Sequence, residues 1–455
     1  MKKRQGTTVA TSRLTDAGNA ERMNARHGQD LRYCALWRQW LAWDGKRWLP
    51  DAEGEANLRA QETARNFYQL AAKATDDGER QRWARHAIKS ESAERIAAML
   101  KIGRWNRSIQ VSPDDLDKNP WLLNCVNGMV DLRSGQLLPH DRDRLITKLC
   151  PTSYEPGAEC PTWLAFLDKI HAGNADIIGF CQRLWGYCLT ANVSEQVLPV
   201  FWGTGSNGKS TEVNTMLELL GGDYAIKAAP EIVMMKADAH PCERADLFGK
   251  RVVSCIESTE GRRLNETLVK ELTGGDPIRA RRMRENFWQF MPTHKLVLAT
   301  NHKPVIRGQD YAIWRRVKLI PFTVTITDAE QDKSLPDKLR DELPGILAWA
   351  VRGCLDWQRA GNLGEPDEIR MATAKYRQEQ DVVGEFIEAC CGRDAGIEAK
   401  AGDLFKAYSV WSGDKRMTAR TFGLALAQRG FTSRRGTGGV RCWVGIGLRF
   451  ESDWS

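Results

Sequence analysis

One eight-residue pattern constrains this chain more than any other feature. Residues 203–210 spell Gly-Thr-Gly-Ser-Asn-Gly-Lys-Ser and match the phosphate-binding pattern Gly-x-x-x-x-Gly-Lys-Ser in full. Residues 198–202 before it are apolar and strand-like, and residues 209–220 after it are helix-like. A phosphate bound there would lie at a helix N-terminus, where backbone N–H groups attract anions. The pattern and its context predict a nucleotide site between a strand and a helix.

Each position of this loop has an expected task. The glycines let backbone N–H groups curl around a phosphate without Cβ clashes. We expect Lys209 to reach the β- and γ-phosphates and the Ser210 hydroxyl to coordinate Mg²⁺, which makes ATP and Mg²⁺ the expected cofactors. The predicted nucleotide ligands are Gly203, Gly205, Asn207, Gly208, Lys209, Ser210 and Thr211.

Polar residues beside later strands are candidates for the rest of the site. Residues 252–256 form a buried-strand pattern that ends in Glu257. A carboxylate there is expected to hold Mg²⁺ and polarise the attacking water, with Glu260 as a second candidate. A further apolar strand is followed by Asn301, whose amide can hydrogen-bond the γ-phosphate or that water. Arg315 and Arg316 are candidates for an arginine finger that reaches a neighbour's site; the alternative for this pair is a surface salt bridge.

The order of these motifs resembles the superfamily 3 helicases. More specifically, the chain is similar to the phage and plasmid primase–helicase proteins related to the poxvirus nucleoside triphosphatase-primase. The resemblance extends over most of the chain. The motifs that carry it lie at 127–132 with His140, 186–190, 203–210, 252–257, 272–278, 300–301 and 314–316.

The resemblance implies a ring, usually a hexamer, with ATP bound between subunits. It implies that Lys209 and Ser210 belong to the Walker A motif, that Glu257 is the Walker B acid and that Asn301 is the sensor. It also implies that Arg315 or Arg316 acts in trans, without deciding which. The chain departs from the family where a second acid follows the Walker B glutamate, because residues 258–259 are Ser-Thr. The identity of the catalytic base therefore stays open.

Two basic segments are candidates for contact with DNA. Residues 278–290 can form a hairpin, which in superfamily 3 motors projects into the ring channel and grips one strand. Its arginines suit phosphates, and Phe287 or Trp288 can stack on bases; the alternative is a solvated charged run over core aromatics. The candidate residues are Arg279, Arg281, Arg282 and Arg284 in the hairpin and Arg420, Arg434 and Arg435 in the tail.

Local patterns predict several elements outside the motifs. Asp44-Gly45 and Asn127-Gly128 predict hairpin turns, and helical spacing predicts helices over 55–75, 79–102 and 162–191. Near the C-terminus, helices are expected over 403–412 and 418–429, followed by short strands at 431–435 and 440–446.

Alternating apolar strands and helices from residue 197 predict an α/β core. The predicted fold class is an α/β P-loop ATPase core, AAA+-like and of superfamily 3, between an N-terminal mostly helical domain and a C-terminal winged-helix-like domain. The tail is expected to bind DNA, although such a fold can also bind protein. The predicted parts are an α+β domain (1–150), a helical collar (151–195), the ATPase core (196–330), a helical region (331–395) and the winged-helix-like domain (396–455).

Composition fits this interpretation without deciding it. The net charge of +8 is compatible with a polyanionic partner. The twelve cysteines contain no Cys-x-x-Cys pair, so a zinc ribbon is not indicated and reduced, buried thiols are expected. No apolar run is long enough for a membrane span, and no secretory signal follows the basic start. We therefore expect a cytoplasmic protein of a bacterial host cell, without a membrane partner.

The sequence as a whole predicts an ATP-dependent DNA helicase that replicates a phage, plasmid or integrated mobile element by translocating on single-stranded DNA. Its expected partners are single-stranded and forked DNA, further copies of itself and a separate primase or loading protein. Residues before the hairpin at 122–132 are too few for a polymerase-type domain, so no priming activity is expected. The alternatives are an origin-melting ATPase without processive unwinding and a P-loop kinase.

Overall fold

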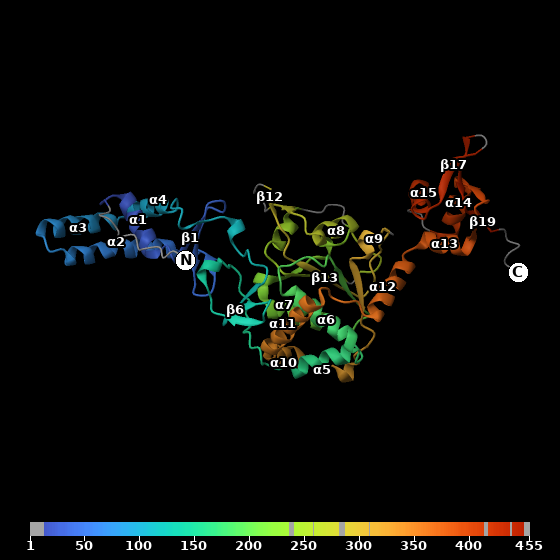
Figure 1. Cartoon of the computed structure of the whole chain (residues 1–455), viewed down its shortest axis with the longest axis horizontal. Helices are drawn as coiled ribbons and strands as arrows, with labels where there is room; N and C mark the ends of the chain where they lie inside the picture. The colour runs from blue at the N-terminus through green and yellow to red at the C-terminus, as the bar shows by residue number, and fades with distance from the viewer. Residues whose placement is uncertain are drawn as a thin grey trace.

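The chain forms an elongated molecule with a central body and a smaller unit at each end (Figure 1). The structure is a computed structural model that describes residues 13–235, 241–257, 259–281, 287–308, 310–413, 417–436 and 439–449. Each end unit buries its own hydrophobic core, around Met23 and Trp48 at the N-terminal end and around Phe386 at the C-terminal end. Within the described ranges, every helix is too short or too polar to cross a lipid bilayer.

The N-terminal unit combines four helices with a four-stranded sheet. Its elements are α1 (Asp16–His27), β1 (Leu31–Cys34), β2 (Gln39–Trp43), β3 (Trp48–Pro50), α2 (Glu55–Lys73), α3 (Asp77–Ser90), α4 (Ala93–Gly103) and β4 (Gln110–Val111). The sheet order is β3-β2-β1-β4, and the predicted Asp-Gly turn joins β2 to β3. One long helix was expected over 79–102, but the chain breaks after Ser90. Ser92 caps a new helix there, because its side chain accepts the N–H of Arg95.

A small meander follows and packs under the central body. It consists of β5 (Leu122–Cys125), β6 (Gly128–Asp131) and β7 (Gln136–Leu138). The predicted Asn-Gly hairpin is confirmed, although Gly128 pairs with Cys125 and therefore already belongs to the second strand. Asn127 fixes the turn, since its side chain both donates to and accepts from the backbone of Tyr154 at 3.0 Å.

The central body is built on a five-stranded parallel sheet. Its strands are β8 (Leu198–Trp202), β9 (Ala225–Ala228), β10 (Val252–Glu257), β13 (Lys295–Thr300) and β14 (Val317–Pro321), in the order β14-β8-β13-β10-β9. Every residue of β13 is buried, which is why the central strands appear in the sequence as continuous apolar runs. The mixed α/β fold with a parallel sheet is thus confirmed.

Helices cover this sheet (Figure 1). They are α5 (Pro161–Ile170), α6 (Ala175–Cys188), α7 (Lys209–Tyr224), α8 (Glu266–Gly274), α9 (Tyr311–Trp314), α10 (Leu335–Asp341), α11 (Leu343–Ala360) and α12 (Asp367–Glu379). The helix expected over 162–191 is two helices, because the chain turns at residues 171–174 and Asn174 caps α6. A short antiparallel ribbon, β11 (Ile278–Ala280) with β12 (Trp288–Phe290), stands apart from the parallel sheet.

The C-terminal unit follows α12. It contains α13 (Val382–Cys390), β15 (Cys391–Gly392), β16 (Glu398–Lys400), α14 (Ala401–Ser412), α15 (Ala419–Gln428), β17 (Thr432–Arg435), β18 (Arg441–Val444) and β19 (Gly447–Leu448). The predicted pair of helices followed by a hairpin is present, and β16 adds a third strand beside β18.

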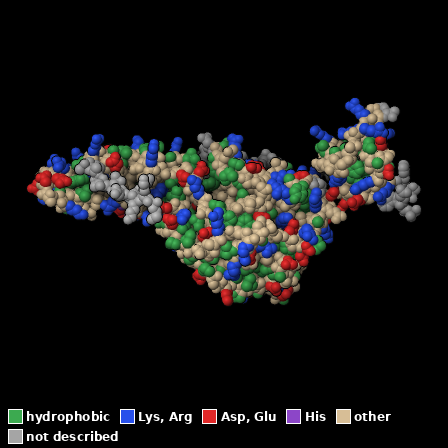
Figure 2. Space-filling model, viewed as in Figure 1, with side chains coloured by type: hydrophobic (Ala, Val, Ile, Leu, Met, Phe, Trp, Pro, Cys, Tyr) green, Lys and Arg blue, Asp and Glu red, His purple; other side chains and the backbone are tan. Residues whose placement is uncertain are grey.

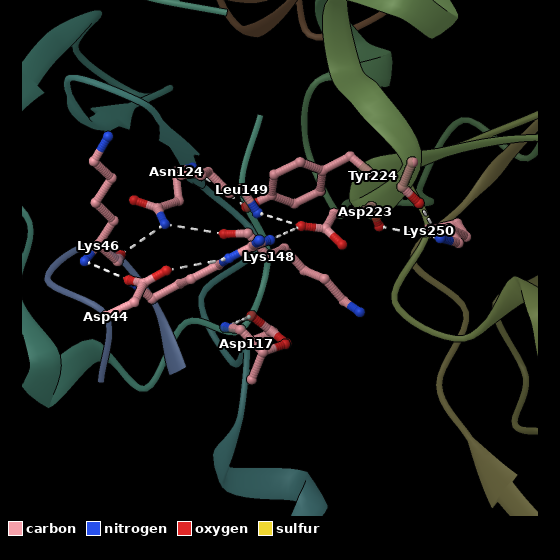
Figure 3. A network of polar contacts seen from close by, with 12 residues as sticks. Asp44, Lys46, Asp117, Asn124, Lys148, Leu149, Asp223, Tyr224 and Lys250 are labelled. Carbon is pink, nitrogen blue, oxygen red and sulfur yellow. Dashed lines mark hydrogen bonds and ion pairs between the residues drawn. The ribbon is translucent and has the colours of Figure 1, made fainter. Parts of the chain in front are cut away.

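A polar joint connects the N-terminal unit to the far end of α7 (Figure 3). Arg47, in the β2–β3 turn, forms an ion pair with Asp223. The same carboxylate accepts the backbone N–H of Leu149 at 3.0 Å. Asn124 donates to the carbonyls of Lys46 and Lys148, both at 2.9 Å. These contacts join three segments that are remote in sequence.

Candidate nucleotide site and DNA-contacting surfaces

The predicted site residues converge at one edge of the parallel sheet. The 203–210 loop follows β8, Glu257 ends β10 and Asn301 follows β13, and these three strands are parallel neighbours in the order β8-β13-β10. Carboxyl ends of parallel strands meet at the same edge, where open α/β sheets bind their ligands. After β8 the chain crosses to the far edge of the sheet, where it forms β9, and it later returns to form β14 on the other side of β8. The loop therefore lies at a reversal of strand order.

The glycines of the loop have specific steric reasons. A Cβ on Gly203 would lie 2.3 Å from Asn207 Nδ2 and 2.4 Å from the carbonyl oxygen of Phe322. Gly208 has a φ of +85°, and a Cβ there would lie 2.4 Å from Ile170. A side chain at either position would push the loop away from the helices and strand that shape it.

Lys209 is the charged centre of the loop. Its side chain is only 4% exposed. The amine donates to the carbonyl of Gly203 at 2.7 Å, to Asn207 Oδ1 at 2.8 Å and to Asn301 Oδ1 at 3.1 Å. Burial lowers the pKa of this amine to about 8. Among the described residues Lys209 pairs with no carboxylate, so three neutral oxygens hold a buried cation.

The remaining residues of the loop and the first turn of α7 carry further polar groups. Asn207 is buried, and its Nδ2 has no hydrogen-bond partner among the described residues. Ser210 is exposed and Thr211 is half-buried at the start of α7. Gly208 is the N-cap of α7 and has no side chain to cap the first N–H groups. An anion at this helix end would satisfy such groups.

Glu257 is the last residue of β10, two strands away from β8 in the sheet, and is only 4% exposed. Its Oε1 accepts the backbone N–H of Thr259 at 2.7 Å. Its Oε2 lies 2.9 Å from Nη1 of Arg262, and Arg262 also donates to Glu231 at 3.0 Å. Sequence reasoning missed Arg262 and Glu231. Glu260, the second candidate acid, is exposed.

The two candidate finger arginines have opposite environments. Arg316 is buried, and it donates to Thr273 Oγ1 at 3.1 Å and to the carbonyl of Ala312. Arg315 is exposed, donates to Gln196 Oε1 and lines a pocket of about 1200 Å³. Arg316 is therefore held by hydrogen bonds within this chain, whereas the Arg315 side chain is exposed at the surface.

The predicted hairpin at 278–290 is present as β11 and β12. Ile278 and Ala280 are buried while Arg279 between them is exposed, as a period of two requires. The guanidinium groups of Arg279 and Arg281 lie 4.2 and 5.0 Å from the ring centre of Phe287. Two cations thus share one exposed aromatic ring. Arg282 and Arg284 lie outside the described residues.

The tail candidates lie on the surface of the C-terminal unit. Arg420 is exposed in α15, and Arg434 and Arg435 are exposed on β17. Arg434 also forms an ion pair with Glu398 at 2.5 Å. Figure 2 shows Lys and Arg side chains gathered over the tip of this unit, beside β17.

A buried group with metal-ligating side chains lies behind the loop. The ligand atoms of His171, Cys181 and Glu212 lie within 4.8 Å of one another. Glu212 accepts the indole N–H of Trp185 at 2.7 Å, and its other oxygen lies 3.4 Å from His171. Glu212 Oε2 and His171 Nδ1 nevertheless have no hydrogen-bond partner among the described residues, so these contacts satisfy the buried carboxylate only in part.

Two family models match the chain. Residues 20–172 match the family described as D5 N terminal like. Residues 201–316, which contain the loop, Glu257 and Arg315, match a family of unknown function, DUF5906.

Curated viral proteins are similar to this chain. A protein of Acanthamoeba polyphaga mimivirus, named "Putative helicase", is 29% identical over 65% of this chain and 33% of its own length. A protein of Frog virus 3 with the same designation is 26% identical over 63% of this chain and 30% of its own length. A protein of African swine fever virus, named "Putative primase", is 26% identical over 69% of this chain and 35% of its own length. The chain thus spans about a third of the length of the curated relatives it matches.

Solved structures share the fold. Two apo structures of the C-terminal region of NrS-1 align with a TM-score of 0.50 and 10% sequence identity. The alignments cover 95% and 94% of this chain and 100% and 99% of the NrS-1 chains.

The similarity to these relatives supports a replication-related protein of helicase or primase type. Together with the D5 N-terminal-like match, they support a protein of the primase–helicase family, as the sequence motifs predict.

Proposed function

We propose that this chain is the ATP-driven motor of a DNA helicase that translocates on single-stranded DNA during replication of a mobile or viral element. One observation carries the proposal. Lys209 is a buried cation held only by neutral oxygens, at the edge of the sheet where Glu257 also lies. A charge buried without an opposite charge is costly. A nucleotide phosphate would supply that opposite charge.

The residues around Lys209 fit a triphosphate with Mg²⁺. The unpartnered Nδ2 of Asn207 is a donor for a phosphate oxygen, and the missing Cβ of Gly203 lets the loop backbone close against Asn207 and Phe322. Ser210 and Glu257 would hold the ion, which would neutralise charge that develops on the transferred phosphoryl group. Asn301 keeps its Nδ2 as a donor for the γ-phosphate or the attacking water.

The two arginines differ in how well they could serve a site that is shared between subunits. A finger must leave its own subunit and reach a neighbour's phosphates. Arg316 is committed to Thr273 and Ala312, whereas Arg315 is exposed. We therefore assign the trans-acting role to Arg315 in a ring, with a hexamer as the expected size.

The DNA grip is assigned to the β11–β12 hairpin and to the C-terminal unit. Phe287 presents an exposed ring to a base, and Arg279 and Arg281 beside it suit the adjacent phosphates. The helices and three-stranded sheet of the C-terminal unit suit a winged-helix-like fold, with Arg420 and Arg435 exposed for phosphates.

A strand-displacement assay with forked DNA, Mg²⁺ and ATP tests the proposal. The wild type is expected to unwind, and Lys209→Ala is expected to bind DNA without unwinding. Lys333→Ala, which changes an exposed lysine remote in sequence from the loop, is the matched control.

ATP hydrolysis, measured with and without DNA beside strand displacement, separates the alternatives. ATP hydrolysis stimulated by DNA but without displacement would favour an origin-melting ATPase. Hydrolysis that DNA fails to stimulate, again without displacement, would refute the helicase and leave the kinase.

A further inference from the structure

The loop between β10 and α8 directs one arginine at the candidate Walker B acid. Nη1 of Arg262 lies 2.9 Å from Glu257 Oε2 and 3.0 Å from Glu231 Oε1. Glu257 ends β10, whereas Glu231 belongs to the short 3₁₀ turn Pro230–Ile232 after β9. A single guanidinium nitrogen thus bridges two carboxylates from different segments.

The backbone on both sides of Arg262 is fixed. Its carbonyl accepts the N–H of Val305 at 2.8 Å, and Leu264 donates to the carbonyl of Val305 at 3.0 Å. Arg263 accepts the N–H of Met235 at 2.8 Å. Since neighbouring segments hold the loop on two sides, the fold itself presents this side chain to Glu257. The side chain is 24% exposed, so solvent screens the contact only in part.

The two carboxylates are not held in the same way. Arg262 donates an aligned hydrogen bond to Glu231. Glu257 Oε2, although close to the same nitrogen, receives no hydrogen bond. Glu231 therefore anchors Arg262, and Glu257 is paired by charge alone. A cation held in this way can give up Glu257 without losing its own hydrogen bond.

We propose that Arg262 is a positioning residue that holds Glu257 in the nucleotide-free state and competes with Mg²⁺ for its carboxylate. The inference rests on the proposed function, since it requires that Mg·ATP bind at this edge. When Mg²⁺ takes the carboxylate of Glu257, Arg262 keeps its hydrogen bond to Glu231. The same loop continues into α8, whose last residue is followed closely by β11, so this exchange takes place on the segment that leads to the DNA hairpin.

The test is the Mg²⁺ dependence of equilibrium binding of a fluorescent ATP analogue to the full chain. Arg262→Gln removes the competitor, and the Mg²⁺ concentration for half-maximal binding is expected to fall roughly fivefold or more. Arg262→Lys keeps the charge and is expected to stay near wild type. Arg263→Gln is the matched control, because Arg263 pairs with Glu266 at 3.9 Å and is 41% exposed.

A second variant changes the same quantity in the opposite direction. Glu231→Gln leaves Arg262 with Glu257 as its carboxylate partner, so the half-maximal Mg²⁺ concentration is expected to rise. General damage to the fold would move both variants in the same direction. Shifts of the same sign, or no shift relative to Arg263→Gln, would overturn the inference while leaving the nucleotide site intact. A wild type that binds no nucleotide would remove the proposed function and the inference together.

Discussion

Alanine substitutions of the adjacent residues Arg315 and Arg316 are expected to change different properties of the protein. Arg316 is 7% exposed and donates to Thr273 Oγ1 and to the carbonyl of Ala312. Arg315 is exposed and has one hydrogen bond, to Gln196. The first is therefore expected to act on stability, and the second on catalysis.

The magnitudes follow from these contacts. Each hydrogen bond to a charged group contributes about 1.5–3 kcal/mol net. Arg316→Ala is therefore expected to lower the free energy of unfolding by about 3 kcal/mol, which corresponds to a fall in Tm of about 6–12 °C for a domain of this size. Arg315→Ala changes a surface group and is expected to alter stability by less than about 0.5 kcal/mol. A lost arginine finger lowers kcat by about 10³-fold or more.

Thermal unfolding and ATPase rates measure the two effects. Mixtures of Arg315→Ala with Lys209→Ala subunits are expected to recover ATPase, because a neighbour supplies Arg315 to an intact loop. The reasoning is refuted if Arg316→Ala keeps its Tm but loses ATPase, or if Arg315→Ala keeps its ATPase. Failure of the mixture to recover any rate would refute the trans arrangement.

Three further outcomes are expected. Burial lowers the pKa of Lys209 to about 8, and a bound phosphate keeps the amine protonated, so ATP affinity should be constant below pH 8 and fall about tenfold per pH unit above it. Equilibrium titration of ATP binding at several pH values measures this decline, which Lys209→Arg should abolish. A flat wild-type profile up to about pH 9.5 would contradict the reasoning. Phe287→Ala should weaken single-stranded DNA binding by about 1–3 kcal/mol through lost stacking, with an unchanged salt slope since the arginines remain; fluorescence anisotropy at several salt concentrations decides, and undiminished affinity would remove the ring from the grip. Glu342→Ala should lower the free energy of unfolding by about 1–2 kcal/mol, because Glu342 accepts the N–H groups of Thr162 and Trp163 at the start of α5; denaturant unfolding checks this, and an unchanged midpoint would contradict it.

The sequence predicts the core of the fold well because the central strands are buried on both faces. β8, β10 and β13 are mostly apolar runs, and β14 at the edge of the sheet still buries Val317, Leu319 and Ile320, so the sequence pattern predicts all four strands. The strand β9 escaped because it has four residues, two of them alanine and one lysine, at the edge of the sheet. The breaks inside the helices expected over 79–102 and 162–191 escaped because helical spacing continues across each capped turn.

The sequence predicted only those residues of the candidate site that lie in a motif or at the end of a strand. The contact between Lys209 and Asn301 follows once both are assigned to carboxyl ends of neighbouring strands. Glu231 and Arg262 lie on a 3₁₀ turn and a loop, and only tertiary structure brings them to Glu257. Local sequence could not separate Arg315 from Arg316, because burial of one side chain beside α8 decides between them.

The joint at Asp223 has a mechanical consequence. The helix α7 runs from Lys209 to Tyr224 with a kink at Gly221, so its regular part, residues 209–220, is a rod about 18 Å long. Its phosphate end faces the nucleotide position, and its far end is tied to Arg47 of the N-terminal unit. A tilt of this part by about 5° would move its far end, next to the kink, by roughly 1.6 Å. A change in the tilt of α7 when nucleotide binds would therefore reach the N-terminal unit through the Arg47–Asp223 ion pair, and a substitution of Asp223 would remove that connection.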